Sequence, residues 1–176
     1  MLKRISIAAA FGLGFIGAYL SLPVNLWLGG EGGFLLRPEP VIIPAALPFG
    51  LPAIIGTSIG VLLHNLFFRL TPMGVTIPFS VAQTIVVLAA SYLAMTLRQR
   101  LPRPFNNLAA TWLISALIIL VLGGFAALEY GTPVLEEWEH ILREVLIPIN
   151  VFGLLVLEAI DFRGRASTGN PKREGL

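Results

Sequence analysis

Long apolar runs without charged residues alternate with short polar segments along the chain. Four such runs cover residues 5–30, 40–68, 70–97 and 104–128, and only His64 among them can gain a charge near neutral pH. A helix needs roughly 20 apolar residues to cross the hydrocarbon core of a bilayer, so each run is long enough. A fifth stretch, 141–160, carries Arg143, Glu144 and Glu158 near its ends, where long side chains can reach the interface. The pattern predicts an all-α integral membrane protein.

The run 40–68 is too long for one membrane-spanning helix. Its 29 residues would extend about 43 Å at 1.5 Å per residue, against a hydrocarbon core of about 30 Å. Pro44, Pro48 and Pro52 lie inside it, and an interior proline removes a hydrogen bond and kinks a helix. A tight turn between Pro48 and Pro52 would divide the run, so we expect a short Pro-rich helical hairpin.

The distribution of arginine and lysine supports this division, because cytoplasmic loops of membrane proteins carry an excess of both. Six spans with the N-terminus inside place nine basic residues on the inner side and three on the outer side. A single span over 40–68 would move the arginines of 98–103 outside while Lys3 and Arg4 stayed inside. We therefore predict six transmembrane helices with both termini cytoplasmic, in the cell membrane. The predicted spans are 5–24, 39–49, 52–68, 74–97, 106–128 and 141–161.

The predicted spans define one membrane domain and a short tail. The six-helix domain covers 1–162, and 163–176 form a polar cytoplasmic tail that we expect to be disordered. The outer segment 129–144 is acidic, and Trp138 within it suits a helix that lies at the membrane interface.

The start of the chain has two interpretations. Lys3 and Arg4 followed by the apolar residues 5–19 could form a signal peptide. However, no small-residue cleavage site follows Tyr19, and the apolar run continues to Trp27. We therefore expect a first helix that is retained.

Composition favours a membrane protein over a soluble one. The chain is 56% hydrophobic and 12% charged, whereas soluble domains are about 45–50% apolar and about 25% charged. The net charge of +2, without clustered Lys and Arg on a soluble face, excludes a nucleic-acid-binding surface. The chain has no cysteine, which excludes disulfides, thiolate catalysis and cysteine-based metal sites.

Small residues form two rows on the first predicted helix. Ala10, Gly14 and Ala18 share one face, and Ala8 and Gly12 form a second row. A spacing of four lets another helix approach each row closely. The row could dock a partner helix or could pack inside this bundle. Small residues at 56 and 60 on the third span favour ordinary packing.

Polar side chains at depth in the predicted spans gather in the outer half of the bundle. This outer set comprises Asn25, Trp27, Arg37, Glu39, His64, Asn65, Thr76, Ser80, Gln83, Arg143, Glu144 and Asn150. The inner half holds mainly Ser91, Thr96, Asn106 and Asn107, all close to its rim. Polar groups inside a membrane usually face the bundle interior, so their convergence predicts a pocket open to the outside.

Several of these residues also have a purely structural interpretation. His64 could be a hydrogen-bonded histidine at the interface. Gln83 and Asn150 could join neighbouring helices, which is a common use of amides in membranes. Arg37 and Glu39 could form a solvated ion pair in a loop, which contributes little energy.

No catalytic motif indicates an enzyme. The sequence has no HExxH, no GxSxG and no Walker loop. His64 and His140 are too few and too far apart in sequence to predict a metal site. We expect no enzymatic activity, no metal and no cofactor, and no use of ATP by this chain itself.

The segment from Leu36 to Phe67, LRPEPVIIPAALPFGLPAIIGTSIGVLLHNLF, resembles the second and third helices of the substrate-binding S-components of energy-coupling factor (ECF) vitamin transporters. It is most similar to the queuosine-precursor (QueT-type) family, whose pattern has an Arg and a Glu before a helix, a Pro-rich hairpin, and small residues leading to Asn-Leu. The matching positions are Arg37, Glu39, Pro44 to Pro52, Gly56, Gly60 and Asn65-Leu66. The Arg–Glu spacing is one residue longer in that family, and two prolines flank Glu39 here. The match covers about thirty residues, and the rest agrees in size and topology.

This resemblance implies a membrane subunit that binds a small vitamin-like solute for an importer. Its partners would be a membrane coupling subunit and two cytoplasmic ATPases, which use the ATP. It would dock on the coupling subunit through small residues of its first helix, here Ala10, Gly14 and Ala18. The solute site would come from the outer polar set, with Trp27, Arg37, Glu39, His64, Asn65, Gln83, Glu144 and Asn150 as its residues.

A planar, nitrogen-rich base, such as a queuosine precursor, suits this set of residues. Amides and a carboxylate can pair with the edge of the base, and Trp27 can cover its face. Glu39 or Glu144 can hold an attached amine by a charge-assisted hydrogen bond.

Two alternatives belong to other classes of protein. A structural six-helix membrane protein of cell-wall assembly, similar in size to MreD-type proteins, would use the same polar groups between helices and have no solute pocket. An intramembrane enzyme is disfavoured because no nucleophile–base pair stands out. A buried cavity lined by Arg37, Asn65, Gln83 and Asn150 would favour the transport subunit.

Overall fold

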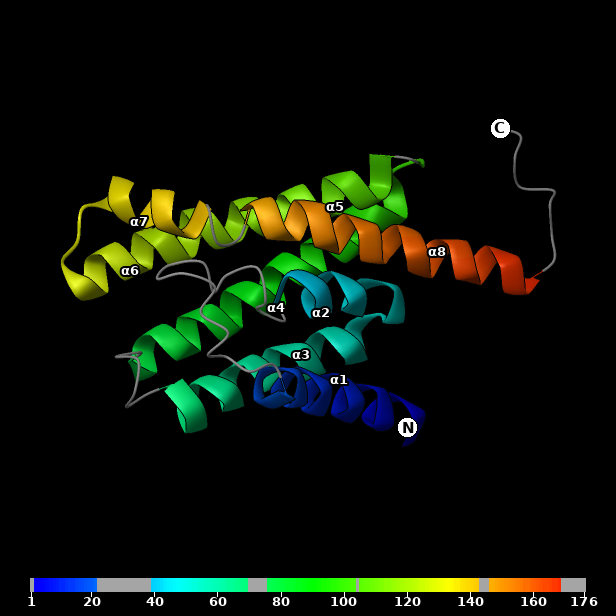
Figure 1. Cartoon of the computed structure of the whole chain (residues 1–176), viewed down its shortest axis with the longest axis horizontal. Coiled ribbons are helices and arrows are strands. Elements are labelled where there is room, and N and C mark those ends of the chain that lie inside the picture. Colours follow the sequence, from blue (N-terminus) through cyan, green and yellow to red (C-terminus); the bar gives the residue numbers. More distant parts are fainter. Residues whose placement is uncertain (1, 22–38, 70–75, 104, 143–145, 169–176) are drawn as a thin grey trace.

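The helices account for nearly all of the chain that the computed structural model describes, which is residues 2–21, 39–69, 76–103, 105–142 and 146–168 (Figure 1). No strand occurs within these residues, which confirms the predicted all-α class. The α-helices are α1 (Leu2–Ser21), α2 (Glu39–Ala46), α3 (Leu51–His64), α4 (Ile77–Arg100), α5 (Phe105–Leu117), α6 (Gly123–Tyr130), α7 (Val134–Ile141) and α8 (Leu154–Thr168). A 3-10 turn, η2 (Leu47–Phe49), and the π-helical turns η3 (Asn65–Arg69), η4 (Ile118–Leu122) and η6 (Ile149–Gly153) extend or join them.

Two helices are long and apolar enough to cross a membrane. One is α4, and the other is the helix Phe105–Tyr130, which α5, η4 and α6 form together. Thr76 caps α4 by accepting a hydrogen bond from the Phe79 amide at 3.2 Å. Arg98 and Arg100 lie in its last turn, where cations interact favourably with the helix dipole. The bounds of these two helices lie within three residues of the predicted spans 74–97 and 106–128.

The segment 39–67 is broken into two helices. The break falls at Gly50, whose φ of 78° is a conformation that residues with a side chain rarely adopt. Pro52 lies in the first turn of α3, where a missing N–H removes no helix hydrogen bond. The result is two short apolar helices, Glu39–Phe49 and Leu51–Phe67.

The direction of the described chain alternates along α1, α2 with η2, α3 with η3, α4, Phe105–Tyr130, and η6 with α8, and the short α7 comes between the last two in sequence (Figure 1). The last two are antiparallel neighbours, because Ser115 contacts Asn150 and Asn107 contacts Glu158. The start of α1, the end of α4, the start of α5 and the end of α8 lie toward the right in Figure 1. We call this the α4–α5 end of the bundle, and the opposite one the α3–α4 end.

The described core is mainly apolar with some buried polar residues, and large apolar side chains also lie on the outside. Its described core combines apolar side chains such as Phe15 and Ile114 with ten buried polar residues. Large apolar side chains stay exposed around the periphery, including Leu13 (70%), Phe67 (75%) and Leu128 (85%). Soluble monomers rarely expose contiguous apolar patches larger than a few hundred Å². The outside of the described bundle is therefore rich in large apolar side chains.

The C-terminal helix corrects one prediction. α8 continues to Thr168, so the expectation of disorder is wrong for residues 163–168, and residues 169–176 lie outside the described part. The helix is already anchored by buried residues such as Leu157. Extending α8 beyond its anchored part costs little free energy, because each added residue gains a hydrogen bond without a new nucleation step.

A short helix follows α6 in the acidic segment, as the sequence predicted. The chain reverses at Gly131, whose φ of 68° is left-handed, and α7 begins at Val134. Trp138 packs on Gly123, where a Cβ would collide with its indole ring. Glu136 and Glu139 remain exposed. The position of this helix at a membrane interface stays a prediction.

Candidate functional site

Five of the eight predicted solute-binding residues lie in the described part of the chain. These are Glu39, His64, Asn65, Gln83 and Asn150. The other three, Trp27, Arg37 and Glu144, lie outside the described residues, as does Arg143. The role of all eight in binding stays a prediction.

Asn65 and Gln83 form a direct pair toward the α3–α4 end. Asn65 begins the π-helical turn η3 and is 1% exposed, and its Nδ2 donates to Gln83 Oε1 at 2.7 Å. His64 precedes it and is also buried, with its ring edge-on to Phe15 at 6.3 Å between centroids. The pairing of the two amides joins η3 to α4, which is the structural use that the sequence left open.

Asn150 forms a second amide contact, between η6 and α5. Its Nδ2 donates to Ser115 Oγ and to the Leu146 carbonyl, both at 2.8 Å. Ser115 is fully buried and donates in turn to the Thr111 carbonyl at 2.6 Å. The Oδ1 atom of Asn150 is buried and has no hydrogen-bond partner in the described structure. This amide therefore links two helices and keeps one unused acceptor.

Glu39 is the first residue of α2, and its carboxylate lies at the positive end of the helix dipole. The side chain is half-buried. No hydrogen bond within the described residues connects the Asn65–Gln83 pair with the Asn150–Ser115 pair. The described structure therefore places these residues in separate helix contacts and does not by itself assemble the cavity that the sequence predicted.

One row of small residues on α1 is used for packing within the bundle. A Cβ added at Gly12 would lie 3.0 Å from Gly56 O, and one at Gly60 would lie 2.9 Å from Gly12 O. A Cβ at Gly56 would collide with the Ala8 carbonyl. The pairing of Ala8 with Gly56 and of Gly12 with Gly60 makes α1 and α3 parallel neighbours in backbone contact. The structural interpretation of Gly56 and Gly60 is confirmed.

The other row on α1 faces away from this contact. Ala10 and Gly14 are exposed and Ala18 is half-buried. A Cβ added at Gly14 would meet no atom within 4 Å. In the described structure, Gly14 of this row is therefore not packed closely against another helix of the bundle.

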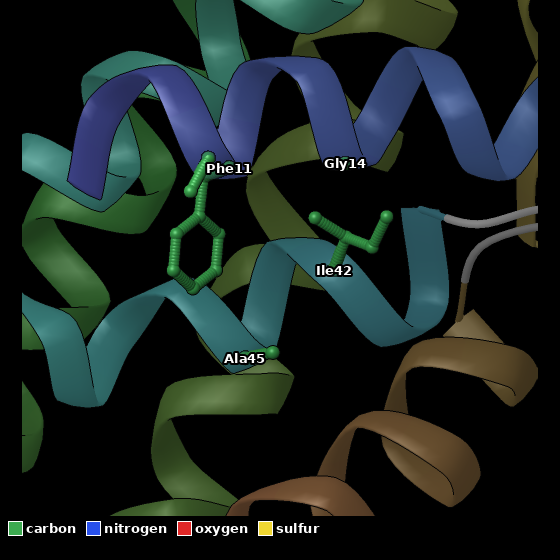
Figure 2. A pocket seen from close by; sticks show the side chains of 5 residues that line it. Phe11, Gly14, Ile42 and Ala45 are labelled. Carbon is green, nitrogen blue, oxygen red and sulfur yellow. The ribbon is translucent and has the colours of Figure 1, made fainter. Parts of the chain in front are cut away.

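A groove lies beside the exposed row, between α1 and α2 (Figure 2). Its volume is about 220 Å³. Its lining is apolar and consists of Ala10, Phe11, Gly14, Ile42 and Ala45. It differs in place and chemistry from the polar pocket that the sequence predicted.

A cluster of charged and amide side chains lies at the α4–α5 end, where α4, α5 and α8 meet. Arg98 Nε donates to Asn107 Oδ1 at 2.7 Å, and Arg98 Nη2 lies 2.6 Å from Asp161 Oδ1. Asn107 Nδ2 donates to Glu158 Oε1 at 2.7 Å and to Asp161 Oδ2 at 3.1 Å. Arg103 Nη2 approaches Asp161 Oδ2 at 3.0 Å. The amide thus bridges a cation and two carboxylates, and we call these five residues the Asn107 network.

Sequence reasoning missed this network. It gave Asn107 a depth close to the inner rim but no partner, and the side chain proves to be fully buried. A signal was present, because Glu158 and Asp161 are three residues apart and therefore share a helix face. That face meets the arginines at the end of α4 only because α4 and α8 are spatial neighbours of α5, which hydropathy does not reveal.

Comparison of the chain with models of known protein families, with curated proteins and with solved structures finds no match.

Proposed function

We propose that this chain is the membrane-embedded solute-binding subunit of an importer of the ECF type. The observation that carries the proposal is the division of α1 into two faces. One small-residue row is packed against α3, and in the other row Ala10 and Gly14 are exposed while Ala18 is half-buried. An outward row of small residues lets a second protein's helix approach closely. A coupling subunit that works with two ATPases is the partner that we assign to it.

The membrane setting of this proposal rests on three features. Two helices are long and apolar enough to span a bilayer. Six helical segments alternate in direction, including the Pro-rich pair divided at Gly50 that we take as a hairpin. The exposed surface is rich in large apolar side chains. We take the six segments as spans, with the α4–α5 end and both termini on the cytoplasmic side of the cell membrane.

We place the solute toward the α3–α4 end, among Glu39, His64, Asn65, Gln83 and Asn150, with Trp27, Arg37 and Glu144 completing the site. The free acceptor of Asn150 and the amides of Asn65 and Gln83 suit the edge of a planar, nitrogen-rich base. A queuosine precursor is the solute class that we favour. Because Asn65 and Gln83 bond each other, the solute must share or replace that hydrogen bond when it binds.

A structural protein of the MreD type is the second candidate, and a specific observation favours it. Both amide contacts, Asn65–Gln83 and Asn150–Ser115, join neighbouring helices and use at least part of the hydrogen-bonding capacity that a solute would need. In a structural protein, joining neighbouring helices would be the only role of these buried amides.

Calorimetric titration of the purified chain with 7-aminomethyl-7-deazaguanine separates the two candidates. The transport subunit binds the base, and Glu39→Gln and Asn65→Ala each weaken binding by about 1.5–3 kcal/mol, because a charged or buried polar contact is lost. Glu136→Gln is the matched control, since Glu136 is exposed on α7 and leaves binding unchanged. Mass spectrometry of ligand extracted from the purified protein tests for other solutes. Absence of any bound solute, together with unchanged folding, would contradict the proposal.

The docking part is tested separately by Gly14→Leu. This change should block assembly with the coupling subunit and leave solute binding intact, because a Cβ added at Gly14 has no atom within 4 Å. Gly124→Leu is the matched control, since Gly124 lies on α6 and a Cβ added there also has no atom within 4 Å. If Gly14→Leu abolished folding and binding together, the row would be an internal packing surface instead.

A further inference from the structure

The groove between α1 and α2 has the size and chemistry of a hydrocarbon-binding site. Phe11 and Gly14 of α1 line it together with Ile42 and Ala45 of α2 (Figure 2). Its volume is about 220 Å³, and an apolar cavity of roughly 150 Å³ already holds benzene. No polar side chain lines the groove, so a solute with hydrogen-bonding groups would leave them unsatisfied there.

A positive charge lies on the same face of α1, below the groove. Lys3 precedes Ala10 by seven residues and Gly14 by eleven, which is close to two and three full helical turns. The three residues therefore share one face of the helix. Lys3 is exposed, and so is its neighbour Arg4. In the described part of the chain the ion pairs involve Arg98, Arg103 and Asp161 and neither of these cations.

The spacing between charge and groove matches one leaflet of a bilayer. Eleven residues of helix measure about 16 Å at 1.5 Å per residue. One leaflet of the hydrocarbon core is about 15 Å thick, half of the full core. A phosphate held at Lys3 would therefore place the acyl chains of the same molecule alongside Ala10 and Gly14.

We infer that the free subunit holds one anionic phospholipid on this face, with its phosphate at Lys3 and Arg4 and an acyl chain in the α1–α2 groove. The inference rests on the membrane embedding within the proposed function and not on the identity of the solute. Because the lipid covers Ala10 and Gly14, it occupies the row that the coupling subunit contacts, and it leaves when that subunit docks.

Native mass spectrometry of the full chain from mixed micelles tests the inference, with phosphatidylglycerol and phosphatidylcholine of identical acyl chains as the probes. The expected result is one retained phosphatidylglycerol and a clear preference over phosphatidylcholine. Lys3→Gln should lower phosphatidylglycerol affinity about fivefold, the contribution of one cation at the membrane surface. Arg163→Gln, at an exposed position of α8, is the matched charge control and should change nothing.

Filling the groove supplies the second arm. Ala45→Phe projects a ring into it from α2, without altering the α1 row, and should reduce lipid retention at least tenfold for both lipids. Ala89→Phe, at an exposed position of α4, is the matched control. Helix content by circular dichroism confirms that each variant is folded. If Ala45→Phe does not fold, Lys3→Gln still tests the inference.

Equal retention of the two lipids, or retention that neither Lys3→Gln nor Ala45→Phe reduces, would overturn the inference. Solute titration on the same samples separates the two proposals. Solute binding without selective lipid binding removes the lipid site only. Selective lipid binding without any solute removes the transport function only. A chain that stays soluble and monomeric without detergent removes both.

Discussion

Asn107 offers the sharpest test of how this bundle is held together. The side chain is fully buried and makes three hydrogen bonds, all to charged groups on α4 and α8. Replacement by leucine keeps the number and branching of the side-chain heavy atoms and removes all three hydrogen bonds. The Arg98–Asp161 ion pair survives the change, so neither charge is left without an opposite partner.

The expected loss of stability follows from these contacts. A hydrogen bond to a charged group contributes about 1.5–3 kcal/mol in soluble proteins, whereas those within membranes average about 0.6 kcal/mol. Three such bonds, at an edge of the bundle between these settings, give a loss of about 2–4 kcal/mol for Asn107→Leu. The measurement is unfolding by sodium dodecyl sulfate in mild detergent, followed by far-ultraviolet circular dichroism.

Two further variants separate hydrogen bonding from packing. Asn107→Asp adds a third carboxylate beside Glu158 and Asp161. This variant should therefore be less stable than Asn107→Leu at neutral pH, and its stability should recover in acid, where the added carboxylate is protonated. Asn106→Ala removes one contact, the acceptance of the Asn107 amide N–H at 2.8 Å, and should lose about 1 kcal/mol. A free energy of unfolding for Asn107→Leu within about 0.5 kcal/mol of that of the native chain would be a smaller loss than about one such hydrogen bond. The network would then not hold the helices together.

The remaining predictions concern topology, helix packing and the amide pair. Cysteines introduced singly at Gln99 and Thr132 should react oppositely with an impermeant thiol reagent added outside, with labelling at 132 only, and the reverse pattern would end the six-span arrangement. Gly56→Ala should destabilise by about 1–3 kcal/mol, because its Cβ collides with the backbone of α1; unfolding that matched the native chain would contradict the close contact. In a double-mutant cycle, Asn65→Leu and Gln83→Leu should show a coupling of about 0.6–1.7 kcal/mol, and strictly additive effects would mean that their 2.7 Å contact carries no energy.

Local signals in the sequence were enough to locate most helices. Proline and glycine act on the backbone of their own segment, so the break at Gly50 followed from residues 48–52. Hydropathy likewise placed α4 and the helix Phe105–Tyr130 to within three residues. The helical conformation of residues 163–168 was not predicted, because a helix can extend past its anchored part without any apolar pattern.

Contacts between helices were harder to anticipate, because they depend on which faces become neighbours. The sequence showed two small-residue rows on α1 but not which of them packs against another helix. The structure shows that the row of Ala8 and Gly12 packs, because it is in backbone contact with Gly56. Gln83 and Asn150 could be assigned a depth but not a partner, and their partners proved to be Asn65 and Ser115. The Asn107 network combines three helices, and the spacing of Glu158 and Asp161 indicated a shared face but not its partners on α4 and α5.

The parallel packing of α1 on α3 has a consequence for the time course of synthesis. Ala8 and Gly56 touch in the finished bundle, yet roughly 50 residues separate them, and a complete antiparallel segment intervenes. At about 5–20 residues per second, a ribosome needs roughly 2–10 s to deliver α3 after α1 has emerged. During that interval the inner face of α1 has no helix to contact. Under the proposed membrane function, the insertion machinery would have to shelter both small-residue rows of the new helix, and the finished bundle later covers the row of Ala8 and Gly12.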